Sequence, residues 1–279
     1  MESPRYTKGG IPKIIHQTWK NNDIPEKWKI SHTEWQRLHP DWIYHLWTDS
    51  EIRSYIAEHH PDLLILHDSY KYPIQRADMI RYIVLYDFGG LYSDLDLYPT
   101  KNIESYLNHL TDYVVYSANS NYFTNAFMVA KKHSPVFLDV IKGLSDPKPW
   151  WAIGKHLHVM TSTGPMLFHR ILKATKHTYS VLPQAVFNPY SVADNLEEVK
   201  EGTCIRTLEG SSWHSWDSTL YNIIFRNKEL FTGIGIAFFI ILLFGSLYLL
   251  FRLIYVKKYM KKVTAICNEI CQLHTAKIM

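Results

Sequence analysis

One short stretch decides the fold of this chain: Phe88-Gly89-Gly90-Leu91-Tyr92-Ser93-Asp94-Leu95-Asp96. The paired glycines predict the end of a helix, and the three residues after them predict a short buried strand. Two aspartates then stand one residue apart, and on an extended segment such side chains project to the same side. Two carboxylates held in this way suit Mg²⁺ or Mn²⁺, and such a cation suits a diphosphate. We therefore expect an enzyme site for a nucleotide-activated donor.

The segment before the glycines predicts a helix over residues 76–88, because its apolar residues recur at steps of three and four. Asp78 and Arg81 are three residues apart and share one face of this helix. Two interpretations are open. The two side chains form a structural ion pair, or the helix aims Asp78 at sugar hydroxyls and Arg81 at a phosphate or sugar oxygen.

Strand and helix patterns alternate through the rest of the first 180 residues. We expect strands over residues 13–16, 42–47, 113–117 and 126–130, and helices over 25–38, 49–59, 134–144 and 164–174. Asp49 or Ser50 is the expected cap of the second of these helices. Such alternation predicts an α/β domain with a mostly parallel sheet. In these sheets ligands bind beyond the carboxyl ends of the strands, which is where the acidic pair lies.

The charge of the chain is uneven, and this bears on its partners. The net charge is +4 over 279 residues, but the tail from Arg252 onward holds six Lys or Arg against one Glu. The residues before it hold 24 basic and 25 acidic side chains. The basic balance therefore belongs to the tail, and nucleic-acid binding is not expected. Cys267 and Cys271 in this tail are either reduced thiols or palmitoylation sites.

Residues 230–251 form an uncharged apolar run of 22 residues, long enough to cross a bilayer as a helix. The cluster of Lys and Arg behind it places the tail in the cytosol and residues 1–229 in the lumen. Residues 1–10 lack the apolar region of a signal peptide. Three alternatives follow: an upstream segment is missing from this sequence, translocation is unusual, or the domain is cytosolic, with which the absence of an N-x-Ser/Thr sequon agrees. The expected parts are a tail (1–10), a catalytic domain (11–220), a linker (221–229), the transmembrane helix (230–251) and a cytosolic tail (252–279).

The chain resembles a known family at spaced points over residues 11–217. Arg76-Ala77-Asp78, Arg81-Tyr82, Leu85-Tyr86 and the stretch from Gly89 to Asp96 resemble the signature of DXD glycosyltransferases. The run from Ile11 to Trp19 is similar to the first strand of the yeast-type Golgi mannosyltransferases. The run Gly210-Ser211-Ser212-Trp213-His214-Ser215 is similar to a late motif of the inositol phosphorylceramide mannosyltransferases, the catalytic subunits of MIPC synthase. Family members usually carry an N-terminal membrane segment, which residues 1–10 do not show.

This resemblance implies a GT-A-like, Rossmann-type fold and a catalytic group formed by Asp78, Arg81, Asp94 and Asp96. Asp96 would bind Mn²⁺ (or Mg²⁺) directly, and Asp94 would hold the ribose or reach the metal through water. Asp78 and Arg81 would bind the donor sugar. His214 would be a late ligand to the metal or the diphosphate, although a lone histidine is often a surface or core residue.

Two further donor-binding positions follow from the resemblance. Trp19 would lie near the nucleotide base, with a core tryptophan as the equal alternative. Gly164, in Thr163-Gly164-Pro165, would belong to a loop that closes over the donor. A plain helix start, with proline near its first turn, explains these three residues as well.

The implied reaction is a retaining transfer of mannose from GDP-mannose to a lipid acceptor, inositol phosphorylceramide, by a membrane-bound enzyme of the Golgi or endoplasmic reticulum. A regulatory membrane subunit is a further expected partner. One alternative is transfer from a UDP-sugar to a glycan or protein. Another, from a different class, is a non-catalytic membrane adaptor that keeps the fold.

Overall fold

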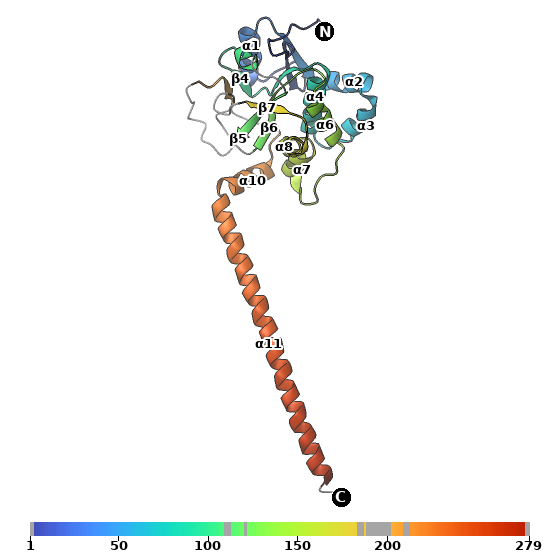
Figure 1. Cartoon of the computed structure of the whole chain (residues 1–279), viewed down its shortest axis with the longest axis vertical. Helices are drawn as coiled ribbons and strands as arrows, with labels where there is room; N and C mark the ends of the chain where they lie inside the picture. The colour runs from blue at the N-terminus through green and yellow to red at the C-terminus, as the bar shows by residue number, and fades with distance from the viewer. Residues whose placement is uncertain are drawn as a thin grey trace. The chain divides into compact units, whose positions relative to one another are not determined.

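The computed structural model describes residues 3–108, 113–119, 122–182, 187, 202–208 and 213–276. By their contacts these divide into a unit over residues 1–222 and a second unit over residues 223–279. Figure 1 labels the elements along the chain. The helices of the first unit are α1 (Glu26–Leu38), α2 (Asp49–His59), α3 (Pro61–Ser69), α4 (Pro73–Asp87), α5 (Glu104–Leu107), α6 (Pro135–Gly143), α7 (Gly154–Ser162) and α8 (Pro165–Ala174).

The strands are β1 (Ile14–Trp19), β2 (Ile43–Thr48), β3 (Gly90–Ser93), β4 (Leu97–Pro99), β5 (Tyr113–Asn119), β6 (Tyr122–Ala130), β7 (Tyr179–Leu182) and β8 (Ile205–Thr207). Six of them form one sheet in the order β2-β1-β3-β6-β5-β7, and β4 pairs with β8. β1 is parallel to β2 and β3, and β5 is parallel to β7, whereas β6 is antiparallel to β3 and β5. The predicted α/β class with a sheet rich in parallel pairs is confirmed.

The central strands bury both faces, so the sheet lies between two apolar layers. In β3, Leu91 belongs to one hydrophobic cluster and Tyr92 to the other, and in β6 Val129 and Met128 divide in the same way. This alternation is the period-two pattern of a strand. Helices α4, α6 and α8 cover the face with Tyr92, and α1 contributes Trp35 to the opposite face.

Helix α4 is the element that carries the site, and it is longer at its start than the predicted 76–88. Pro73 opens it, and the side chain of Gln75 accepts a hydrogen bond from the backbone N–H of Tyr72 at 3.1 Å. Every residue from Asp78 to Leu85 is buried. A helix enclosed in this way fixes its polar side chains as firmly as its apolar ones.

The paired glycines end α4 as predicted and let β3 lie close to β1. Gly89 and Gly90 have φ angles of +67° and +94°, which L side chains rarely adopt. A Cβ on Gly90 would lie 2.5 Å from the carbonyl oxygen of Ile14 in β1. Only glycine therefore allows this approach of the two strands.

Two local predictions were wrong. Asp94 and Asp96 lie in a tight turn between β3 and β4, closed by the N–H of Leu97 donating to the carbonyl of Asp94 at 3.1 Å, and not on an extended segment. The cap of α2 is Thr48, whose hydroxyl accepts from the N–H of Glu51, and not Asp49 or Ser50. The first error extends the strand beyond Ser93, and the second places the helix cap one or two residues too late.

The second unit contains helix α11 (Lys228–Ala276), which follows α10 (Trp216–Arg226) along the chain. Among the described residues, Glu229–Lys261 is the one helical stretch long and apolar enough to cross a membrane, with a mean hydropathy of 2.6 and none of that window buried. The predicted apolar helix over residues 230–251 is confirmed. It continues beyond Arg252, so that much of the basic tail is helical.

Candidate active site

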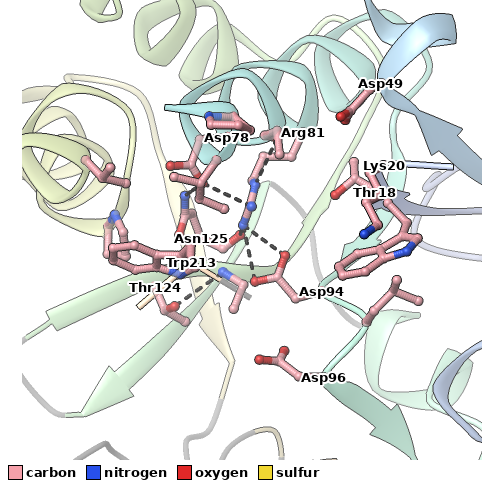
Figure 2. Close-up of a pocket in the computed structure, with 18 of the residues that line it drawn as sticks. Thr18, Lys20, Asp49, Asp78, Arg81, Asp94, Asp96, Thr124, Asn125 and Trp213 are labelled. Carbon is pink, nitrogen blue, oxygen red and sulfur yellow. Dashed lines mark hydrogen bonds and ion pairs between the residues drawn. The ribbon is translucent and has the colours of Figure 1, made fainter. Parts of the chain in front are cut away.

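A pocket of about 510 Å³ opens at the carboxyl ends of β1 and β3 and beside the first half of β6, a volume in the range of ligand sites in proteins. Figure 2 shows the side chains around it. The lining includes five of the predicted site residues, brought together from α4, β1 and the turn after β3. They are Trp19, Asp78, Arg81, Asp94 and Asp96.

Arg81 is the centre of the site. Its guanidinium is buried and lies 3.0 Å from a carboxylate oxygen of Asp78 and 3.0 Å from one of Asp94. It also donates to the carbonyl oxygen of Asn125 at 2.9 Å and lies over the ring of Tyr92 at 4.7 Å. One side chain thus joins the helix, the acidic turn and β6, as the dashed lines in Figure 2 show.

Asp78 is held by two neutral donors as well as by Arg81. The amide of Asn125 donates to one carboxylate oxygen at 3.0 Å, and the hydroxyl of Thr163 donates to the other at 2.9 Å. Burial raises the pKa of Asp78 to about 6, against the lowering effect of Arg81. The helical ion pair predicted from spacing therefore exists, and it faces the pocket rather than solvent.

Asp94 and Asp96 differ in their environments. Asp94 accepts a hydrogen bond from the hydroxyl of Tyr92 at 2.7 Å and pairs with Arg81. Among the described residues, the carboxylate of Asp96 has no hydrogen-bond or ion-pair partner on another residue, and it is partly exposed at the pocket. Burial and the neighbouring Asp94 raise the pKa of Asp96 to about 7.

These two carboxylates fit a divalent cation. Like charges held close together raise each other's proton affinity, and a cation between them or beside them removes that cost. Hard carboxylate oxygens are the ligands that Mg²⁺ and Mn²⁺ prefer. Within the described residues no group of three or more His, Cys, Asp or Glu surrounds such a site, so water and a diphosphate would have to complete the coordination.

Two walls with aromatic and basic side chains flank the acidic residues. In Figure 2 Thr18 and Lys20 lie on one side of Asp94, and Thr124 and Trp213 lie on the other. Trp19 packs its ring edge-on against Trp28 at 5.1 Å and donates to the carbonyl of Asp23 at 3.1 Å. An indole fixed in this way offers a rigid face for a flat ring.

Lys155 and Trp213 form the second wall. The ammonium of Lys155 donates to the carbonyl oxygen of Trp213 at 2.5 Å, and both residues line the pocket. Lys155 is the second residue of α7, so this wall joins the start of a helix to the late segment of the chain.

Two predicted residues lie outside the lining. Gly164 is the residue before α8, where its N–H donates to the carbonyl of Val159 at 2.9 Å, while its neighbour Pro165 lines the pocket. His214 is exposed and lies against the rings of Trp213, at 4.9 Å, and His156, at 6.1 Å. The residues Gly210, Ser211 and Ser212 of the same motif lie outside the described residues.

Sequence reasoning missed several polar residues of the lining or its support, among them Asn125, Thr163, Lys155 and Asp49. Asn125 and Thr163 are buried partners of Asp78, and nothing in their local sequence marks them. The family resemblance includes Thr163 in the loop around Gly164 but predicts no role for its side chain. Lys155 lies in the first turn of α7, whose sequence lacks a clear apolar period. The sequence marks Asp49 only as a candidate helix cap.

The residues of this site lie in a stretch of the chain that matches a known family. The family model described as the glycosyltransferase sugar-binding region containing the DXD motif matches residues 25–116. This range holds Asp78, Arg81 and both residues of the acidic turn. The resemblance to DXD glycosyltransferases is confirmed.

Particular relatives are similar over most of the chain. It is 37% identical over 238 residues to inositol phosphoceramide mannosyltransferase 3 of Schizosaccharomyces pombe, which covers 84% of this chain and 65% of the relative. It is 35% identical over 241 residues to mannosyl phosphorylinositol ceramide synthase CSH1 of Saccharomyces cerevisiae, covering 83% and 61%. The chain thus spans less than two thirds of the length of these relatives. Among solved structures, the PaToxG glycosyltransferase matches with a TM-score of 0.42 and 20% identity, over 59% of this chain and 68% of that one.

Proposed function

We propose that the protein is a metal-dependent, retaining glycosyltransferase that transfers mannose from GDP-mannose to inositol phosphorylceramide. The observation that carries the proposal is the arrangement around Arg81, which holds Asp78 and Asp94, while Asp96 at the pocket has no ion-pair partner among the residues that the structure describes. The names of the two yeast relatives support a mannosyl donor and this lipid acceptor.

Asp96 and Asp94 would hold Mn²⁺ or Mg²⁺, with His214 as a later ligand. When bound, the cation supplies positive charge that stabilises the leaving diphosphate. Asp78, fixed by Asn125 and Thr163, would accept hydrogen bonds from sugar hydroxyls.

Arg81 keeps these carboxylates in place and adds positive charge beside the donor. Lys155 extends that charge on the opposite wall. Trp19 would face the base of the nucleotide, and Gly164 would keep the loop before α8 close to the donor.

The acidic groups that line the pocket are Asp49, Asp78, Asp94 and Asp96. Asp78 and Asp94 are engaged by Arg81, and Asp96 is assigned to the metal. A retaining transfer in which the acceptor proton leaves with the diphosphate oxygen requires no further enzymic nucleophile, and this chain's residues then only bind and orient the reactants.

We further propose that α11 anchors the enzyme in a membrane of the Golgi or endoplasmic reticulum. The excess of Lys and Arg behind the apolar stretch favours a cytosolic tail and a lumenal domain. An anchored domain meets lipid headgroups at high effective concentration, which suits a sphingolipid acceptor. A regulatory membrane subunit remains part of the proposal.

The donor is testable by thermal unfolding of the full chain in detergent with Mn²⁺. A bound donor at a hundredfold excess over its Kd should stabilise the domain by about 2.7 kcal/mol. We expect this shift with GDP-mannose and a smaller one with UDP-sugars. A larger shift with a UDP-sugar would show that the donor is that UDP-sugar and not GDP-mannose. No shift with any nucleotide sugar would contradict transferase function and favour the adaptor.

A further inference from the structure

Five large apolar side chains are exposed on one part of the first unit. They come from the segment before α7 and from α10, and they are 41–90% exposed. We call them the tryptophan surface: Trp150, Trp151, Ile153, Trp216 and Leu220. Three tryptophans exposed together need a partner that covers them, because contiguous apolar surface of this kind marks interaction sites.

The two segments of this surface are fixed to each other. The carboxylate of buried Asp217 accepts from the N–H of His156 at 2.7 Å, and the ring of Tyr221 stacks on that of His156 at 5.5 Å. The hydroxyl of Tyr221 also donates to the carbonyl of Ile153 at 3.3 Å. Helix α10, which lies near α7 in Figure 1, is therefore docked through Asp217 and Tyr221, whereas Trp216 is exposed.

The tryptophan surface continues into the wall of the pocket. Lys155 follows Ile153 by two residues and Trp213 precedes Trp216 by three, and both line the pocket. The hydrogen bond between them at 2.5 Å ties the surface to the site. A partner that covers the surface therefore lies beside the pocket.

We infer that the tryptophan surface docks on the lipid bilayer and presents the pocket to its headgroup layer. The chain itself points to this occupant, because one residue, Asn227, separates α10 from α11, with its 33-residue apolar stretch. If α11 spans a membrane, α10 stays within a few residues of the interface. Tryptophan is the side chain that prefers this interface, where its ring is buried and its N–H meets water. The inference rests on the proposed membrane anchor and names the surface that meets the lipid.

The test uses the full chain reconstituted in phosphatidylcholine vesicles whose acyl chains carry bromine near the headgroup. All nine tryptophans lie before α11, so quenching of their emission reports contact of the domain alone with lipid. We expect the wild-type emission to be quenched. The variant Trp150→Gln/Trp151→Gln/Trp216→Gln should lose this quenching.

A second variant, Ile153→Gln/Leu220→Gln, keeps every tryptophan and should also lose most of the quenching. Ile65→Gln is the matched control, because Ile65 is 83% exposed but lies on α3, and it should behave as wild type. The thermal midpoint of each variant in detergent shows that the domain is folded.

Several results would overturn the inference: wild-type emission without quenching, or quenching in the two surface variants as strong as in wild type. A dimer in detergent that only these variants lose would also overturn it, because it would assign the surface to a second copy of the chain. The failure of this inference and that of the proposed function can be told apart, since quenching needs neither donor nor transfer. If wild-type chain fails to float with vesicles, the anchor itself fails as well.

Discussion

Asp96→Asn is expected to lower sugar transfer by about 10³-fold or more, while the domain stays folded. The carboxylate of Asp96 makes no bond to another described side chain, so its loss removes no packing. It removes a charged oxygen ligand from the proposed cation, which carries the charge of the leaving group. Because burial and Asp94 raise the pKa of Asp96 to about 7, the carboxylate is ionised at pH 8 but lowers the stability of the folded protein relative to the unfolded chain, in which its pKa is lower. The thermal midpoint at pH 8 should therefore stay the same or rise.

Metal dependence gives this prediction a readout besides activity. Mn²⁺ alone should raise the thermal midpoint of the wild-type chain and leave that of Asp96→Asn unchanged. Asp62→Asn, an exposed change on α3, is the control and should respond to Mn²⁺ as wild type does. Wild-type transfer rates in Asp96→Asn with metal present would exclude the proposed role of this residue.

Arg81→Ala should destabilise the domain by about 3–5 kcal/mol and abolish transfer. The change leaves the carboxylate of Asp78 buried without its counter-charge, and removing one partner of a buried pair typically has an effect of this size. It also frees Asp94 from its ion pair at 3.0 Å. Thermal or denaturant unfolding followed by tryptophan emission measures the loss.

Two controls show whether the loss of stability comes from the unpaired charge or from removing any arginine of this helix. Arg76→Ala, on the same helix, removes one hydrogen bond to the carbonyl of Tyr70 and should lose only about 1 kcal/mol. In Arg81→Leu the further change Asp78→Asn should restore part of the stability, because the unpaired charge is gone, yet transfer should stay absent. Equal stability of Arg81→Ala and wild type would mean that this ion-pair group does not hold the site together.

Much of the site could be predicted from sequence because its residues are close along the chain. Asp78 and Arg81 are one helical turn apart, and the paired glycines connect their helix directly to the acidic turn. Local spacing therefore carries most of the geometry. The same local reasoning placed Asp94 and Asp96 on an extended segment, since the hydrogen bond that closes their turn is not visible in residue types.

The rest of the site depends on contacts between distant segments. Asn125 meets Asp78 across 47 positions, and Thr163 meets it across 85. Neither side chain has a pattern of its own, so only the packing of β6 and the end of α7 against α4 reveals them. The sequence period of α4 predicted one apolar face, whereas the structure buries this helix on nearly all sides. This burial also depends on contacts with segments that are distant along the chain.

Transfer of mannose to a sphingolipid at this pocket can be measured directly by analysis of the product. Full-length chain in vesicles containing inositol phosphorylceramide is incubated with labelled GDP-mannose and Mn²⁺, and the lipids are separated and identified by mass spectrometry. We expect the wild-type chain to form a mannosylated inositol phosphorylceramide and the Asp96→Asn variant to form none. A labelled product on another acceptor, or the same product from both chains, would contradict it.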